Sequence, residues 1–202
     1  MTDELGLREG QHRKTVRRYN LPGNAHYLTF SCYHQLPLLN EAEHCQRLIG
    51  ALQAAREGHG FSLWGYVIMP EHVHLLLYPQ RKDYSISTVL HAIKRPAAFH
   101  CLAQLRVRRP DLIPRLTVTQ GRRTEVRFWQ AGGGYDRNIV TVEECREKLT
   151  YIHENPVRRG LVKRPVDWPW SSARFWAGVE DVPLTMDRPL PWCGTGCPAL
   201  RA

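Results

Sequence analysis

The sequence has no long apolar run, no internal repeat and no low-complexity tract. Because no stretch of about 18 apolar residues is present, the sequence predicts no membrane-spanning helix. Residues 1–18 are rich in charge and contain no apolar segment of the kind found in secretory signals. We therefore expect a globular protein of the cytoplasm.

The sequence also lacks the cysteine pairs of a zinc site. Of its six cysteines, four are isolated in segments with apolar periodicity and are predicted to be reduced core residues: Cys32, Cys45, Cys101 and Cys145. Cys193 and Cys197 flank a short turn that contains glycine, but no second pair accompanies them. We interpret these two as free thiols.

Positive charge is in excess. Lys and Arg number 28 against 19 Asp and Glu, which gives a formal net charge of +9. Such a surplus attracts polyanions, so nucleic acid or an anionic membrane is the first partner to consider, and a charged surface kept for solubility is the alternative. The length suits one domain with appendages and is too short for a TIM barrel with its loops. Composition divides the chain into a basic arm, a main domain and a tail rich in Trp and Pro, at residues 1–20, 21–164 and 165–202.

Hydrophobic periodicity predicts that strands and helices alternate in the main domain. Alternating or continuous apolar residues predict strands over residues 25–33, 61–69 and 72–78. Apolar residues spaced three and four apart predict helices over residues 41–57 and about 85–105.

A further helix is expected near residue 141. Thr141 and Glu144 form a capping box, which marks the beginning of a helix. The helix should end at Asn155, because Pro156 disfavours helical geometry in the residue before it. The order of elements indicates an α+β fold of split βαβ type, with an antiparallel sheet and helices on one face.

Two histidines, His72 and His74, are two residues apart in the third predicted strand. Side chains at i and i+2 of a strand point to the same face, so both imidazoles converge on one point. Two neutral imidazoles on a rigid strand form half of a metal site. Two hydrogen-bonded histidines on a half-exposed strand are the alternative. Leu76 stands where a third histidine would indicate a nucleotide-hydrolase histidine triad, which argues against that class.

Tyr151 lies off the apolar stripe of the helix that begins at Thr141. On a helical wheel it is roughly 140° from the centre of that stripe, whereas a core tyrosine would lie within it. Asn155, one turn further on, projects from the same side. A phenol nucleophile and an amide able to bind a metal would therefore project together. An ordinary exposed tyrosine and an asparagine that ends a helix are the alternatives.

The histidine strand and the tyrosine helix together fit one reaction. A divalent metal on His72 and His74 would polarise a scissile phosphate, and Tyr151 would attack it to form a covalent link to the 5′ phosphate. This link conserves the energy of the phosphodiester, so a new end can be joined without ATP. Asn155 would supply an oxygen ligand, which favours Mg²⁺ or Mn²⁺. A phenol is a weak acid and Glu147 lies one turn earlier, so the metal and nearby cations must help it ionise.

Five blocks of sequence resemble one protein family. Residues 69–75, Met-Pro-Glu-His-Val-His-Leu, resemble the HUH motif of single-tyrosine transposases. Residues 151–162 resemble the block that carries the nucleophile in the REP-associated tyrosine transposases. Similar blocks are found at residues 17–23, 128–130 and 168–172. Because the blocks occur in order over roughly residues 15–176, the resemblance is far more specific than any single motif.

The resemblance implies a ferredoxin-like sheet with the HUH histidines, His72 and His74, on a central strand. It implies that these histidines and Asn155 hold the metal, that Tyr151 is the nucleophile, and that residues 21–164 form the nuclease domain. The implied activity is metal-dependent nicking and strand transfer of single-stranded DNA at hairpin-forming palindromic repeats, through a 5′-phosphotyrosine intermediate. Some relatives carry Gln at the position of Asn155.

Binding of single-stranded DNA needs cations along a groove and aromatic faces for the bases. Three groups fit this need: Arg17 and Arg18 with Tyr19, then Arg122, Arg123 and Arg127 beside Trp129, and finally Arg158, Arg159 and Lys163 after the proposed nucleophile. Each group alone is also typical of a solvated surface. The expected partner is single-stranded or hairpin DNA and not a membrane, with the protein acting as a monomer or homodimer.

Other functions stay open. A non-catalytic, sequence-specific DNA-binding protein derived from a transposase would bind hairpins without cleaving them. A metal phosphoesterase that uses water would hydrolyse DNA without forming a protein–DNA adduct. Tyr135, after a run of glycines, is a rival nucleophile, but it lacks a ligand-type residue one turn further on. We interpret it as a packing residue or a DNA contact.

Overall fold

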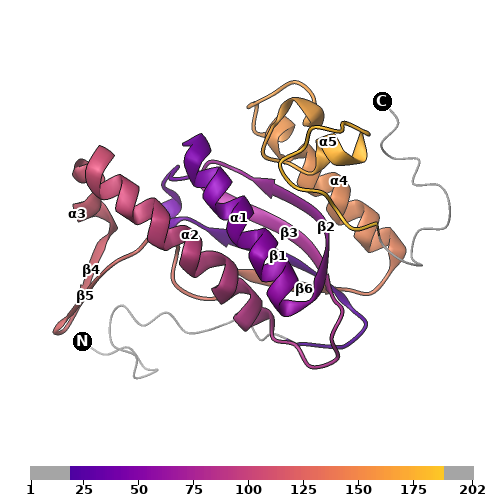
Figure 1. Cartoon of the computed structure of the whole chain (residues 1–202), viewed down its shortest axis with the longest axis horizontal. Coiled ribbons are helices and arrows are strands. Elements are labelled where there is room, and N and C mark those ends of the chain that lie inside the picture. The colour runs from indigo at the N-terminus through magenta and orange to yellow at the C-terminus, as the bar shows by residue number, and fades with distance from the viewer. Residues whose placement is uncertain (1–18, 189–202) are drawn as a thin grey trace, which may run out of the picture.

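The computed structural model describes residues 19–188, and its centre is a four-stranded antiparallel sheet (Figure 1). The strands are β1 (Ala25–Ser31), β2 (Phe61–Ile68), β3 (His72–Pro79) and β6 (Tyr135–Ile139), in the spatial order β2-β3-β1-β6. β3 lies between β2 and β1 and pairs with both. The predicted α+β fold of split βαβ type is confirmed, because β3 is inserted between two strands that a helix connects.

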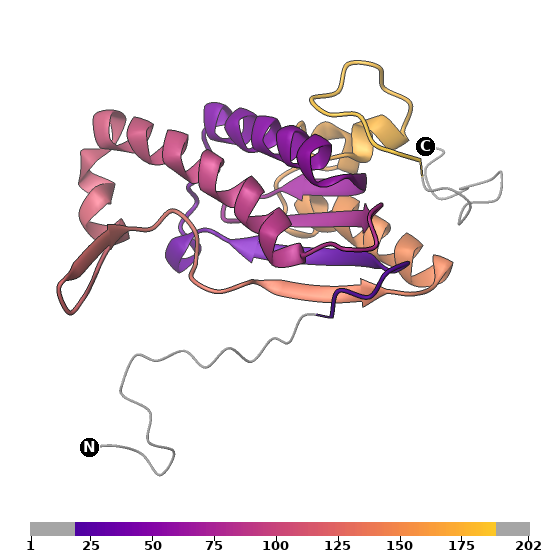
Figure 2. The ribbon, with the colours of Figure 1, turned by 60° about the horizontal axis from the view of Figure 1, so that its bottom comes forward.

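Two long helices cover one face of this sheet. α1 (Ala42–His59) and α2 (Ile86–Arg108) lie side by side above it (Figure 2). Their apolar side chains join the larger core cluster, to which β1 and β3 contribute residues such as Leu28, Phe30 and Val73. The prediction of helices on one face is confirmed for these two elements.

The same prediction is wrong for α4 (Val142–Arg158), which covers the opposite face. Its apolar residues Leu149 and Ile152 pack with Trp64 and Leu76 in a second core cluster. The cause is that β2 and β3 are buried on both faces, and strands of this kind need cover on both sides. The helix packs closely, since a Cβ added to Gly65 would lie 2.6 Å from Cδ1 of Leu149.

The predicted end of α4 at Asn155 is also wrong. The helix includes Pro156 and ends at Arg158. The preference of a residue before proline for extended geometry is a bias that packing can override. Here the last turn is closed by the N–H of Arg159, which donates to the carbonyl of Asn155 at 3.1 Å. As a result Asn155 is helical and buried against the sheet.

The Trp-rich segment after α4 lies along the free edge of β2. The N–H of Ile68 donates to the carbonyl of Trp170 at 2.8 Å. The indole N–H groups of Trp168 and Trp176 donate to the carbonyls of Ile68 and Trp64, each at 2.9 Å. Covering an edge strand in this way prevents it from pairing with another chain. The domain boundary placed at residue 165 stays a prediction.

The remaining elements are short. β4 (Thr117–Gln120) and β5 (Arg123–Val126) form a separate two-stranded ribbon at one end of the molecule (Figure 1). The short helices are η1 (Tyr33–Gln35), η2 (Pro110–Leu112), α3 (Ile113–Leu116), η3 (Pro165–Asp167) and α5 (Ala173–Trp176). None of the helices within residues 19–188 is both long and apolar enough to cross a membrane.

The four isolated cysteines are buried and form no disulfide, as predicted. Cys193 and Cys197 lie outside the described residues, so their interpretation as free thiols stays a prediction.

His153 of α4 connects this helix to the C-terminal segment. Its Nε2 atom lies 2.8 Å from Oγ of Ser172, and the same oxygen accepts a hydrogen bond from the N–H of Tyr66 at 2.9 Å. Burial lowers the pKa of His153 to about 3, so the folded protein holds this imidazole neutral.

We expect the free energy of unfolding to fall as the pH drops below about 6.5, the ordinary pKa of histidine. Between that value and the lowered folded-state value, the unfolded chain binds a proton at His153 that the folded chain does not. The stabilisation is therefore complete above about pH 6.5 and is lost toward about pH 3, at about 1.4 kcal/mol per unit. Urea unfolding at about pH 7.5 and at about pH 5 gives the free energy of unfolding at each pH. Between these two values, the free energy of unfolding of His153→Gln should fall by about 2 kcal/mol less than that of the wild type. Equal losses would contradict the assignment.

Candidate active site

His72 and His74 meet on the face of β3 that α4 covers. Their Nε2 atoms lie 3.0 Å apart, and the two rings are nearly perpendicular. The strand alternation that predicted a shared face therefore holds, and Val73 between them is buried in the opposite core cluster. Because β3 has a neighbour on each side, the two imidazoles stand on a rigid support.

Asn155 reaches the same point from α4. Its side-chain amide lies 3.0 Å from Nε2 of His74, and the residue is 6% exposed. A half-turn of the side-chain amide exchanges its nitrogen and its oxygen. This rotation would direct the oxygen of Asn155 to the same position beside His74. The continuation of α4 through Pro156 holds this side chain in a regular turn of the helix.

The donor set fits a divalent cation. Two ligands on adjacent corners of an octahedron, each about 2.1 Å from the ion, are separated by about 3 Å, and the two Nε2 atoms have this spacing. Burial lowers the pKa of His74 to about 3, and neighbouring His72 adds to the decrease. Burial also lowers the pKa of His72, although Glu71 opposes this. Both imidazoles are therefore neutral near pH 7, as metal ligands must be. Within residues 19–188 no cluster of three or more His, Cys, Asp or Glu could hold a metal, and beside the two imidazoles Asn155 offers an amide oxygen as a further donor.

Two hydroxyl groups on β1 contact the other nitrogen of His74. The Oη atom of Tyr27 and the Oγ1 atom of Thr29 each lie 2.8 Å from Nδ1. Burial raises the pKa of Tyr27 to about 12, so this phenol keeps its proton. A metal on Nε2 requires the ring proton on Nδ1, where these two oxygens are placed to accept it. No sequence motif indicated this pair, whose members are two residues apart on β1 and so share a face of the sheet.

Glu71 contacts the ring of His72, and Arg159 in turn contacts Glu71. The Oε1 atom of Glu71 lies 3.1 Å from Nδ1 of His72 and 2.7 Å from a guanidinium nitrogen of Arg159. The carboxylate can thus accept the ring proton of His72 while Arg159 balances its charge. Arg159 was predicted from the sequence to bind DNA, and no motif indicated a role for Glu71 beside His72.

Tyr151 lies beside the two histidines and remains accessible. Its side chain is 37% exposed, and its ring centroid lies 5.5 Å from that of His74. The ring of Tyr27 is perpendicular to it at 6.2 Å. The guanidinium carbon of Arg158 lies 5.2 Å from the Tyr151 ring, which places a cation beside the phenol. The structure thus brings together the proposed nucleophile and the three proposed ligands.

Tyr135, the rival nucleophile, is near this site but lies on β6, which is separated from the histidine strand β3 by β1. It begins β6, is 49% exposed and lies 6.0 Å from the ring of Tyr27. Gly134 sets its position, because a Cβ there would lie 2.0 Å from the carbonyl oxygen of Thr29 and its φ is +66°.

The residues predicted to bind DNA lie in several places. Arg158 and Arg159 are exposed at the end of α4, and Lys163 is exposed in the segment that follows. The arginines of the second group lie on or next to the β4–β5 ribbon: Arg122, Arg123 and Arg127. Trp129 is buried in the core, so it offers no stacking face. Tyr19 is 57% exposed, and Arg17 and Arg18 lie outside the described residues.

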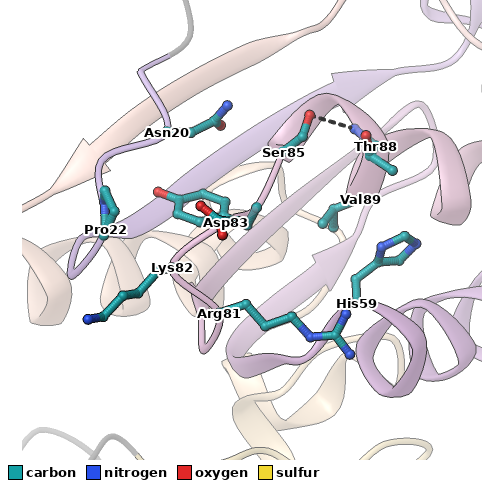
Figure 3. Close-up of a pocket in the computed structure, with 10 residues that line it drawn as sticks. Asn20, Pro22, His59, Arg81, Lys82, Asp83, Ser85, Thr88 and Val89 are labelled. Carbon is teal, nitrogen blue, oxygen red and sulfur yellow. Dashed lines mark hydrogen bonds between the residues drawn. The ribbon is translucent and has the colours of Figure 1, made fainter.

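A pocket of about 600 Å³ that neither His72 nor His74 lines is found at the beginning of α2 (Figure 3). Arg81, Lys82 and His59 contribute basic groups to its lining, and Ser85 caps the helix there. Asn20, where the predicted basic arm ends, also lines it. No pattern in the sequence predicted this pocket.

Comparison with known proteins gives a consistent result. No protein-family model matches the chain. The chain is 24% identical over 178 residues to the REP-associated tyrosine transposase of Escherichia coli strain K12, which covers 88% of this chain and 90% of that protein. A solved structure of a REP-associated tyrosine transposase bound to a REP hairpin matches with a TM-score of 0.64 and 23% identity, covering 87% of this chain and 93% of that one. The chain is therefore similar to the REP-associated tyrosine transposases over most of its length and shares their fold, as its motifs predicted.

Proposed function

We propose that this protein is a transposase that nicks and rejoins single-stranded DNA at hairpin-forming palindromic repeats, through a 5′-phosphotyrosine intermediate. The observation that carries the proposal is the convergence of His72, His74 and Asn155 within 3.0 Å contacts beside the exposed ring of Tyr151. The similarity to the transposase of E. coli and the fold shared with a hairpin-bound relative support the substrate class.

A divalent cation held by His72, His74 and Asn155 would withdraw charge from the scissile phosphate. Mn²⁺ or Mg²⁺ suits two imidazoles and one amide oxygen. Tyr27 and Thr29 hold the ring of His74, and Glu71 holds that of His72, so both ligands are oriented before any ion binds.

Tyr151 acts as the nucleophile. A bond forms between its Oη atom and phosphorus, the bond from phosphorus to the 3′ oxygen breaks, and that oxygen leaves as a 3′ hydroxyl that carries the proton lost by the phenol. A 3′ hydroxyl of another DNA end then attacks the phosphotyrosine, which restores the phosphodiester and frees Tyr151. Arg158 lies beside the ring and offsets the negative charge that develops on the phenol oxygen.

Exposed cations at the end of α4 would hold the DNA. Arg158 and Lys163 are exposed, and Arg159 keeps a half-exposed guanidinium although it pairs with Glu71. Because they lie just after the nucleophile in the chain, they are placed to contact the phosphates that flank the scissile bond.

The proposal is tested by incubating the protein with labelled single-stranded hairpins from its own genomic flanks. With Mn²⁺ or Mg²⁺, a denaturing gel should show a labelled band shifted by the mass of the protein, and EDTA should abolish it. Hairpin binding without any cleavage would support the non-catalytic alternative instead. Cleavage without an adduct would support hydrolysis by water.

The contact between Tyr27 and His74 leads to a separate prediction. Tyr27→Phe removes one acceptor for the ring proton of His74 and should weaken Mn²⁺ binding about tenfold, as is usual for groups that orient a metal ligand. Titration of the protein with Mn²⁺, followed by electron paramagnetic resonance, measures this without any DNA. Tyr78→Phe is the matched control, because Tyr78 is a half-buried residue of β3 that stacks on Trp64. Equal affinities in all three proteins would contradict the role given to Tyr27.

A further inference from the structure

The β4–β5 ribbon is a second basic surface. It projects from the end of the molecule where α2 and α3 finish (Figure 1). The residues at its tip are exposed, including Gln120, Arg122 and Arg123. It is a separate sheet, and two isolated strands of four residues are at most marginally stable. Its residue Val126 is partly buried against the main core cluster, whereas its tip is exposed to solvent.

Charge is concentrated around this ribbon. Residues 106–127 contain seven arginines and two acidic residues, which gives a net charge of +5 within a chain whose total is +9. Glu125 pairs with Arg127 and Arg123, and Asp111 pairs with Arg109. The arginine excess still leaves a strongly positive end, which attracts a polyanion.

The base of the ribbon is joined to the end of the sheet that carries His72. After β5, the N–H of Gln130 donates to the carbonyl of Ser31 at 2.9 Å, and Ser31 is paired with His72. The N–H of Cys32 donates to the carbonyl of Glu71 at 2.8 Å. The segment that follows β5 therefore lies next to the strand ends that carry Glu71 and His72.

The shape and chemistry of the ribbon fit duplex DNA. A strand of four residues spans about 13 Å, and the major groove of about 8.5 Å depth admits a two-stranded ribbon. Arg and Gln at the tip are the side chains that contact guanine and adenine edges, and Thr119 and Thr124 face each other with Oγ1 atoms 3.1 Å apart.

We propose that the β4–β5 ribbon binds the double-stranded stem of the hairpin in its major groove, while the histidine face holds the adjoining single strand. This inference rests on the proposed function, and it assigns the recognition of the duplex to a surface separate from the catalytic residues.

The test compares two DNAs of equal length, a hairpin with a single-stranded flank and the same flank joined to an unpaired sequence. Binding is measured by fluorescence anisotropy with the full chain carrying Tyr151→Phe, so that no cleavage intervenes. The double variant Arg122→Gln, Arg123→Gln should weaken hairpin binding at least tenfold and change binding to the unpaired DNA less than twofold. It should also reduce the magnitude of the slope of log affinity against log salt by about 2.

The double variant Arg47→Gln, Arg95→Gln is the charge-matched control, since both residues are exposed on α1 and α2.

The binding measurements would overturn the inference if they showed unchanged hairpin affinity, an equal loss on both DNAs, or a loss in the control as large as in the ribbon variant. Circular dichroism verifies that the exposed substitutions leave the fold intact. A photo-crosslinker at the exposed Thr119 should react with stem nucleotides, and reaction only with the flank would also contradict it. Adduct formation by the wild type is a separate measurement, so the failure of the proposed function is recognised independently of the ribbon.

Discussion

Tyr151→Phe is expected to abolish the covalent protein–DNA adduct and to leave hairpin affinity within about twofold of the wild type. The substitution removes only the phenol oxygen, so the ring keeps its contacts with His74 and Tyr27. Without a nucleophile no phosphotyrosine can form, and the rate of strand transfer should fall by a factor of 10⁴ or more, on the order of the loss when a nucleophile is removed from other enzymes. Denaturing gels measure the adduct, and anisotropy measures the binding.

Tyr135→Phe is the matched control for this experiment. Tyr135 is also exposed and contacts Tyr27, but it lies on β6, which β1 separates from the strand of His74. This variant should keep adduct formation within a few-fold of the wild type. If Tyr135→Phe lost the adduct while Tyr151→Phe retained it, the two tyrosines would have to exchange roles.

The second large effect is expected from His74→Ala. This histidine contacts His72, Asn155, Tyr27 and Thr29, so its removal takes away one proposed ligand and the centre of the hydrogen-bond network. Mn²⁺ affinity should fall at least about 100-fold, beyond the effect of changing an orienting group. Isothermal titration of Mn²⁺ into the protein, without DNA, measures the change.

His91→Ala is the control for His74→Ala, because His91 is exposed on α2 and lies outside the site. It should bind Mn²⁺ as the wild type does. A His74→Ala protein that is folded and binds Mn²⁺ with unchanged affinity would show that the two histidines are only hydrogen-bonded neighbours on the strand.

Local patterns predicted most of the fold. The continuous apolar run over residues 61–69 and the alternation over residues 72–78 correspond to β2 and β3, and the capping box at Thr141 marks the first turn of α4. Periodicity failed where tertiary packing decides the outcome. Pro156 remains helical because the helix is packed on the sheet, and the covered second face could only be inferred from the apolar character of β2 on both sides.

The sequence predicted those parts of the site that are placed by a single strand or a single helix. His72 and His74 share a face by strand alternation alone, and Tyr151 and Asn155 share one by helical spacing. The contacts of Tyr27 with His74 and of Glu71 with Arg159 depend on strand register and on how α4 docks, and neither is visible in a single sequence. The ribbon was missed as an element because residues 111–130 mix charged and apolar residues without a clear period.

The most direct measurement of the central claim is the identity of the tyrosine joined to DNA. The wild-type protein is incubated with Mn²⁺ and a hairpin, and the adduct is isolated and digested with trypsin. Cleavage after Lys148 and Arg158 releases Tyr151 on residues 149–158, whereas Tyr135 falls on residues 128–137. Mass spectrometry should find the nucleotide on the peptide with Tyr151. A nucleotide on the peptide with Tyr135, or cleaved DNA with no modified peptide, would contradict the account.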